Sequence, residues 1–210
     1  MNSSVSVRSR GYLPHWESEA AVYFVTFRLA DSLPREVAAR LRHERLALQR
    51  ICSAGFQPAV ADKDRLWKLN ALLKKAEQYL DSGLGACHMR DPRIANIVVA
   101  ALRQFNGHRY DRFAWCVMPN HVHVLFSPRA SYRLESILHS WKSYSANQSN
   151  RILRRGGPFW QREYFDHLVR SQSHLLKFAR YIEQNPTKAG LHHWPWVSSR
   201  SAGFPPASFL

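Results

Sequence analysis

The chain has 210 residues, of which 45% are hydrophobic, enough for one domain with a substantial core. Thirty Lys and Arg against fifteen Asp and Glu give a net charge of +15, which favours a polyanionic partner such as nucleic acid. No apolar stretch approaches the roughly 20 residues that span a bilayer. Residues 1–10 lack the apolar core of a secretory signal. We therefore expect a cytoplasmic protein with no membrane partner and no small-molecule substrate.

The three cysteines, Cys52, Cys87 and Cys116, are widely spaced and form no CxxC pair. This pattern indicates neither a zinc ribbon nor a disulfide framework, and it fits a reducing compartment. We expect all three to be structural, with Cys116 buried in a strand.

Hydrophobic periodicity predicts one strand and two helices in the first part of the chain. Residues 1–19 are polar and are expected to be irregular. The aromatic and β-branched residues 20–30 predict a strand. Amphipathic helices are expected over 35–51 and about 65–80, separated by the Gly- and Pro-containing residues 52–62.

The middle of the chain predicts a helix, a hairpin and a second helix. Asp91 and Pro92 are typical of a helix start, and the helix should run to about residue 105. Strands are expected over 110–117 and 121–126, because the second segment alternates strictly between polar and apolar residues. A long amphipathic helix over 134–153 follows.

The last part predicts an extended segment over 159–168 and a helix over 172–184. Ser171 is the expected cap of that helix, and Asn185-Pro186 is expected to end it. This order of elements predicts an α+β fold with a ferredoxin-like antiparallel sheet and helices packed on it. We expect a single domain over 1–196, with a helical elaboration at about 35–90 and an irregular tail over 197–210.

His121-Val122-His123 is the first candidate for chemistry. Two residues on one strand share a face, so both imidazoles can reach one metal ion. Two hydrogen-bonded surface histidines are the competing interpretation, since the chain has eleven histidines.

Longer motifs surround this pair. The segment 114–126, AWCVMPNHVHVLF, resembles the His-hydrophobic-His (HUH) region of single-tyrosine HUH transposases, above all the REP-associated tyrosine transposases. Further similarity to that family extends over residues 10–195 and lies in GYLPHW (11–16), YFVTFRL (23–29), HSWKSY (139–144), FWQ…YFDH (159–167) and RYI…NP…AGL (180–191).

The resemblance implies a mechanism. A tyrosine in the RYI position, here Tyr181, would attack a DNA phosphate and form a 5′-phosphotyrosine. The metal would be Mg²⁺ or Mn²⁺, held by His121 and His123 on a central strand. The family's third ligand is an amide or similar oxygen, for which Asn185 is our choice and Gln184 the fallback, because both share a helix face with Tyr181.

Alternatives remain at these positions. Tyr181 could be a core aromatic, and Tyr144 and Tyr164 are rival nucleophiles. Asp166 and His167 could shape the site or form a structural turn.

The basic residues after the HUH segment predict a surface for single-stranded DNA, where phosphates meet Arg and bases stack on aromatic rings. Residues 127–200 hold twelve Lys and Arg against four Asp and Glu. Trp141, at helical spacing, fits the core better than a stacking platform. The expected DNA contacts are Lys142, Arg151, Arg154, Arg155, Arg162, Arg170 and Arg180.

The resemblance implies a bacterial, nucleoid-associated enzyme that binds hairpins formed by palindromic repeats, then cleaves and rejoins single-stranded DNA. Two alternatives are a DNA- or RNA-binding regulator without strand transfer and a metal-dependent nuclease that uses water. The sequence leaves monomer and homodimer open.

Overall fold

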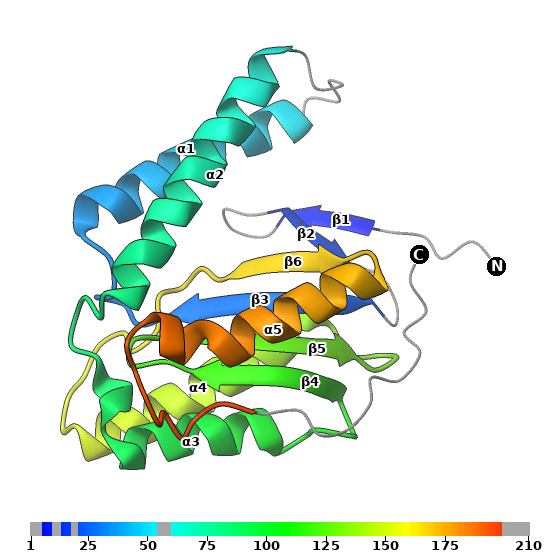
Figure 1. Cartoon of the computed structure of the whole chain (residues 1–210). Coiled ribbons are helices and arrows are strands. Elements are labelled where there is room, and N and C mark those ends of the chain that lie inside the picture. The colour runs from blue at the N-terminus through cyan, green and yellow to red at the C-terminus, as the bar shows by residue number, and fades with distance from the viewer. Residues whose placement is uncertain (1–5, 10–13, 18–20, 54–59, 199–210) are drawn as a thin grey trace.

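The computed structural model describes residues 6–9, 14–17, 21–53 and 60–198. Figure 1 shows a sheet with helices on both of its faces and a helical hairpin projecting beyond one edge. In chain order the elements are β1 (Ser6–Ser9), β2 (Pro14–Glu17), β3 (Val22–Arg28), α1 (Arg35–Ser53), α2 (Val60–Asp81), the 3₁₀ helix η1 (His88–Arg90), α3 (Pro92–Arg103), β4 (Tyr110–Val117), β5 (His121–Pro128), α4 (Leu134–Ile152), β6 (Phe165–Val169) and α5 (Gln172–Lys188).

The main sheet has the strand order β4-β5-β3-β6, and every neighbouring pair is antiparallel. Counted from β3 as the first strand, this is the order 2-3-1-4 with crossovers after the first and third strands. That is the ferredoxin-like topology, so the expected α+β class is confirmed. Strand β5 lies between β4 and β3, which places its residues in the interior of the sheet.

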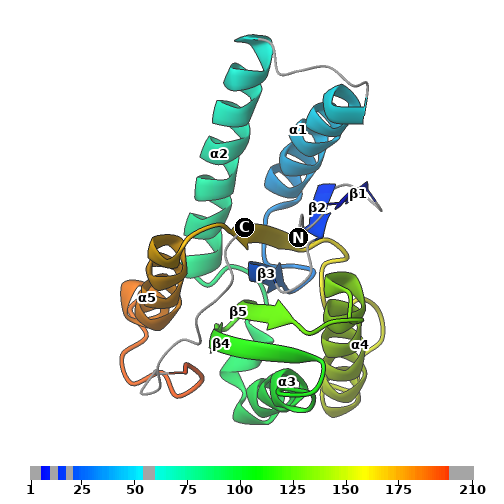
Figure 2. The same cartoon turned by 90° about the vertical axis from the view of Figure 1, so that its right-hand side faces the viewer.

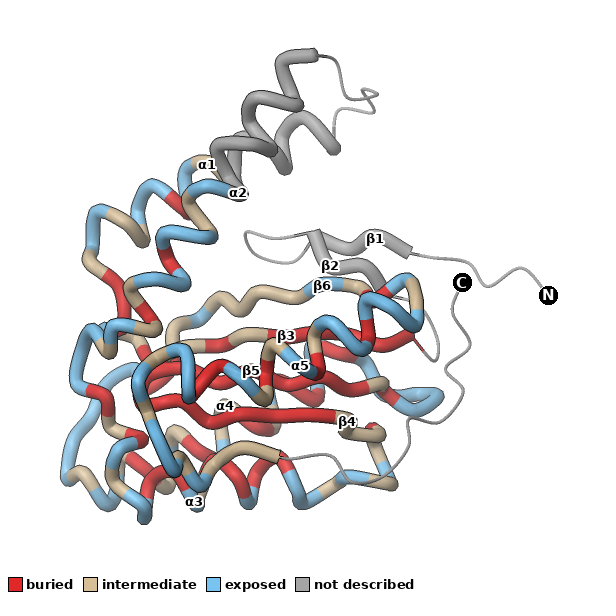
Figure 3. The backbone as a smooth tube through the Cα atoms, in the orientation of Figure 1, coloured by how far each residue is buried: buried red, intermediate tan, exposed pale blue. Residues whose placement is uncertain are grey.

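Each face of the sheet has its own core, because side chains alternate along the strands. Val122, Val124 and Phe126 of β5 pack with α3 and α4. Leu125 faces the other side, where Leu175 and Ile182 of α5 cover the sheet. Figure 2 shows α5 on one face of the sheet and α3 with α4 on the other. Burial is concentrated in β3, β4 and β5 (Figure 3).

Helices α1 and α2 pack on each other as an antiparallel pair with a small core of their own around Leu33, Leu41, Ala76 and Leu80. The turn after α2 passes close to the start of this hairpin, where Ala86 N–H donates to Asp31 Oδ2 at 3.0 Å. Gly85 adopts φ +88° there, and a Cβ would lie 2.7 Å from the carbonyl oxygen of Asp31. Only glycine therefore fits this crossing.

Two expectations about secondary structure are wrong. Residues 1–19 are not wholly irregular, because β1 and β2 pair as an antiparallel hairpin. Helix α5 does not end before Asn185-Pro186 but continues to Lys188. Pro186 removes one helical hydrogen bond, yet Asn185 and Pro186 are both buried, and the carbonyl of Pro186 accepts from Leu191 N–H at 2.8 Å.

Other expectations about single residues hold. Asp91 caps α3 by accepting from Arg93 N–H at 2.9 Å, and Ser171 caps α5 by accepting from His174 N–H at 3.2 Å. Cys116 is buried in β4, and Trp141 is buried in the core. Cys52 lies where no side chains are described. The backbone of residues 197 and 198 still bonds to β4, and the domain limits remain predictions.

Candidate active site

The two histidines of the HUH segment lie side by side on the α5 face of the sheet. Strand β5 carries them at alternate positions, so Val122 between them points to the opposite core. The exposed fraction is 0% for His121 and 1% for His123. Their cross-strand partners on β3 are Arg28 and Thr26, respectively.

An amide next to the motif fixes the protonation of His121. Asn120 Nδ2 donates to the carbonyl of Leu84 at 2.8 Å, which turns its Oδ1 toward the imidazole. His121 Nδ1 lies 2.7 Å from that oxygen. Because an amide oxygen only accepts, Nδ1 carries the proton and Nε2 keeps its lone pair. A metal ligand needs this tautomer.

The second imidazole is held from the neighbouring strand. His123 Nδ1 lies 2.8 Å from the hydroxyl of Thr26, which can donate or accept. The two Nε2 atoms of His121 and His123 are 3.0 Å apart. Two ligands at right angles around an octahedral ion, each at about 2.1 Å, would lie about 3.0 Å apart. The imidazole pair therefore fits a small divalent cation.

Burial keeps both imidazoles neutral. It lowers the pKa of His123 to about 3. It also lowers the pKa of His121 well below the usual value, and the neighbouring His123 adds to the effect. Neutral imidazole is the form that binds metals, so both rings can serve as ligands at neutral pH. His121 already presents the Nε2 lone pair, whereas the hydrogen bond between the two Nε2 atoms places a proton on His123 Nε2 that a metal would displace.

Helix α5 brings Tyr181 against this pair. Its ring packs edge-on to His123, with ring centroids 5.3 Å apart, and it also meets the edge of Phe24 at 5.8 Å. Tyr181 is only partly buried. It lines a shallow groove of ≈ 470 Å³ on α5, which also contains Lys177, Arg180 and Lys188. The predicted nucleophile thus lies between the imidazoles and a basic surface.

Two carboxylates of α2 also belong to this environment. Burial raises the pKa of the Tyr181 phenol, and the nearby charges of Glu77 and Asp81 raise it further. The pKa values of both carboxyl groups are themselves raised, mainly by burial. The phenol is therefore protonated at neutral pH, and attack requires it to lose a proton.

Asn185 lies one turn beyond Tyr181 and is buried, with an exposed fraction of 1%. Neither of its amide atoms has a hydrogen-bond partner of good geometry among the described residues, although Tyr181 and Asp81 are close enough to interact with it. A buried amide without a good partner costs free energy, which is typical of a group reserved for a ligand. The fallback, Gln184, is exposed on α5.

The rival tyrosines occupy other places. Tyr144 is exposed on α4, across the sheet from the histidines. Tyr164 packs against the core on the α3 and α4 side and also lines a pocket beside β3, with no ring contact to either imidazole among the described residues. On β6, Asp166 is partly buried and His167 is exposed, with the His167 ring against Phe178 at 5.2 Å. Of the three tyrosines, Tyr181 is the one that packs on an imidazole of the pair.

The predicted DNA contacts fall into separate groups. All six arginines are exposed. Arg151, Arg154 and Arg155 lie at the end of α4, whereas Arg162, Arg170 and Arg180 lie in and after the segment that leads to β6 and α5. Lys142 is different, because its ammonium donates to the carbonyls of Gln161 and Arg162 at 2.7 Å each. Burial lowers the pKa of Lys142 to about 8.

Sequence reasoning missed Thr26, Asn120, Glu77 and Asp81. Asn120 could have been found, because it directly precedes the histidines in the MPNHVH motif. Thr26 requires the strand register. Glu77 and Asp81 require the packing of α2 near α5, which no local pattern reveals.

Comparisons with known proteins agree with the motifs. The family model "Transposase IS200 like" matches residues 92–185, a range that contains His121, His123, Tyr181 and Asn185. The chain is therefore similar to IS200-like transposases as a class. Within that class, a candidate REP-associated tyrosine transposase of Haemophilus influenzae is 27% identical over 103 residues. The alignment covers 42% of this chain and 58% of that protein. The resemblance to REP-associated tyrosine transposases is thus confirmed.

Two solved structures are also similar. One is a REP-associated tyrosine transposase bound to a REP hairpin, with a TM-score of 0.45 and 16% identity over 91% of this chain and 81% of that one. The other is a candidate transposase of Deinococcus radiodurans, with a TM-score of 0.32 and 15% identity over 85% of this chain and 96% of that one. Within the described part of the chain, no helix has the length and apolarity to cross a membrane.

Proposed function

We propose that this chain is a REP-associated-type tyrosine transposase that binds hairpins in single-stranded DNA and cleaves and rejoins the strand beside them. One observation carries the proposal: two buried, neutral imidazoles have Nε2 atoms 3.0 Å apart, and the ring of one of them, His123, packs against Tyr181 of α5. The family resemblance supports the same three residues. We also propose that residues 1–196 act as one domain, with α1 and α2 as an elaboration and residues 197–210 as a tail.

His121, His123 and Asn185 would hold the divalent ion. Their donor set of two imidazoles and one amide leaves room for phosphate and water. A bound Mg²⁺ or Mn²⁺ would polarise the scissile phosphate and stabilise the charge of the transition state. Asn120 and Thr26 act behind the imidazoles, because Asn120 sets the orientation and protonation of His121 and Thr26 helps to orient His123.

Tyr181 would attack the phosphorus atom. The bond between phosphorus and the 3′ oxygen breaks, a bond between the tyrosine oxygen and phosphorus forms, and the departing oxygen takes up a proton to become a 3′-OH. The phenolic proton must pass to an acceptor. Because the 5′-phosphotyrosine keeps the phosphodiester energy, a second 3′-OH can reverse the step and join a new strand without ATP.

For DNA binding we propose that the exposed Arg162, Arg170 and Arg180 contact phosphates near the site. Arg151, Arg154 and Arg155 would form a second patch at the end of α4. Lys142 would act through the carbonyls of Gln161 and Arg162, whose segment it holds in place.

The test is a cleavage and joining assay on labelled hairpin oligonucleotides with Mn²⁺ or Mg²⁺. Wild type should give metal-dependent cleavage and recombined strands. Tyr181→Phe and His121→Ala should abolish both, whereas the matched control Tyr144→Phe, on the other side of the sheet, should keep them. Cleavage that survives in Tyr181→Phe would overturn strand transfer and favour a nuclease that uses water.

A further inference from the structure

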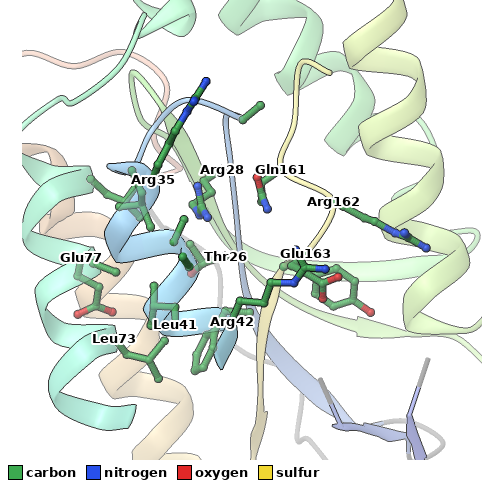
Figure 4. A pocket seen from close by; sticks show the side chains of 18 residues that line it. Thr26, Arg28, Arg35, Leu41, Arg42, Leu73, Glu77, Gln161, Arg162 and Glu163 are labelled. Carbon is green, nitrogen blue, oxygen red and sulfur yellow. The ribbon is translucent and has the colours of Figure 1, made fainter. Parts of the chain in front are cut away.

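A pocket of ≈ 520 Å³ lies between the α1–α2 hairpin, strand β3 and the segment that leads to β6. Figure 4 shows side chains from all of these elements around one space. Four arginines line it: Arg28, Arg35, Arg42 and Arg162. Its volume falls in the range of small-ligand pockets, about 300–1,000 Å³, and is too small for a DNA duplex.

The pocket begins beside the histidine pair. Two of its lining residues, Thr26 and Arg28, are the cross-strand partners of His123 and His121. The hydroxyl of Thr26 is also hydrogen-bonded to His123. A strand whose scissile phosphate lay at the imidazoles would therefore place a neighbouring nucleotide at this pocket.

The walls have two kinds of chemistry. Leu41 of α1 and Leu73 of α2 give an apolar side, and Tyr164 adds an aromatic ring. The arginines supply cations that suit phosphate, while Glu77 and Glu163 supply acceptors. Carboxylates do not favour phosphate, but they accept hydrogen bonds from the amino groups of bases. The combination fits a whole nucleotide better than a phosphate alone.

We propose that this pocket binds one unpaired nucleotide next to the scissile phosphate and selects its base. The base would lie against the apolar side formed by α1 and α2, with its phosphate between Arg28, Arg42 and Arg162. The inference rests on the proposed function, because it takes single-stranded DNA as the substrate. It assigns the α1–α2 hairpin a role in choosing where the strand is cut.

The experiment uses the full chain and a pool of hairpin oligonucleotides with a constant stem and randomised unpaired flanks. Covalent protein–DNA adducts formed with Mn²⁺ are isolated under denaturing conditions and their flanks are sequenced. Wild type should select a base at one unpaired position. Arg42→Ala removes a pocket cation, and Ala39→Trp fills the pocket without changing charge. Both should lower adduct yield at least about tenfold and weaken the base selection, while binding to a flankless hairpin stays within about twofold.

Arg40→Ala is the matched control. Arg40 is exposed on the same helix, two residues from Arg42, and is not among the residues that line the pocket. This variant should keep wild-type yield and selection. Thermal melting of each variant verifies folding, and Arg42→Lys should restore part of the yield.

The outcomes separate the two claims. If wild type forms no Tyr181-dependent adduct with any member of the pool, the proposed function fails and the inference fails with it. If wild type forms adducts and both pocket variants keep its yield and flank preference, the pocket assignment is overturned while the proposed function stands.

Discussion

The side-chain amide of Asn120 determines which nitrogen of His121 carries the proton and which one faces the site. Its hydrogen bonds to the Leu84 carbonyl and to His121 Nδ1 leave Nε2 unprotonated, and Nε2 is the atom that we propose binds the metal. Removing such a group behind a metal ligand typically costs 10–100-fold in metal affinity. We therefore expect Asn120→Ala to weaken Mn²⁺ binding by about that factor in calorimetric titration.

The control for this variant is Asn150→Ala. It also removes a hydrogen bond that a side-chain amide donates to a carbonyl, in this case that of Gly157 at the far end of α4. It should bind Mn²⁺ like wild type. Equal Mn²⁺ affinities for wild type, Asn120→Ala and Asn150→Ala would show that Asn120 does not support the metal site.

Burial of the two imidazoles makes stability depend on pH. An unfolded imidazole takes up a proton near pH 6.5, whereas burial lowers the pKa of His123 to about 3 in the folded chain. Between these values the unfolded state binds more protons, so the free energy of unfolding falls as the pH drops below 6.5. We expect a loss of about 1–2 kcal/mol per buried imidazole from pH 7 to pH 5.

Urea titrations in metal-free buffer at both pH values measure this loss. His123→Gln should reduce the difference between pH 7 and pH 5, and the exposed His108→Gln should leave it unchanged. A difference as large in His123→Gln as in wild type would contradict the buried, neutral state of that ring.

At the scale of elements, the turn after α2 links the helical hairpin to the site. Gly85 lies at the crossing over Asp31, and its neighbour Leu84 provides the carbonyl that orients Asn120. Gly85→Ala would combine an unfavourable φ with a clash against backbone. We expect it to lower the free energy of unfolding by about 2–3 kcal/mol and to weaken Mn²⁺ binding.

Gly107→Ala separates these two costs. Gly107 has φ +84°, but a Cβ there would meet nothing within 4 Å. In a urea titration, Gly107→Ala should lower the free energy of unfolding by about 1 kcal/mol, because only the unfavourable φ contributes. Equal costs for the two variants would show that the crossing over Asp31 is not tight.

Local periodicity was enough to predict most elements. The alternation in residues 121–126 places both histidines on one strand face, and the apolar stripe of residues 172–184 predicts α5. The predicted end of α5 is wrong. The preference against helix before Pro186 is local, whereas the burial of Asn185 and Pro186 depends on the tertiary fold. Strand partners such as Thr26 depend on register between segments that lie 97 residues apart.

At the scale of the whole molecule, the site is assembled from distant parts of the chain. Strand β5 supplies the imidazoles and α5 supplies Tyr181, and the family motifs allowed both to be predicted. Glu77 and Asp81 come from α2, which lies outside the residues 92–185 that the family model matches. Their charges act on Tyr181 only because α2 packs near α5, so sequence reasoning could not place them.

We propose Tyr181 as the nucleophile, and peptide mapping of the covalent adduct identifies the residue that attacks the DNA. Adducts from the randomised hairpin pool are digested with nuclease and trypsin and analysed by mass spectrometry. Trypsin separates the three tyrosines, because Tyr181 lies in YIEQNPTK, Tyr144 in SYSANQSNR and Tyr164 in EYFDHLVR. We predict a nucleotide mass on the Tyr181 peptide alone. The same mass on the Tyr144 or Tyr164 peptide, with the Tyr181 peptide unmodified, would contradict the account.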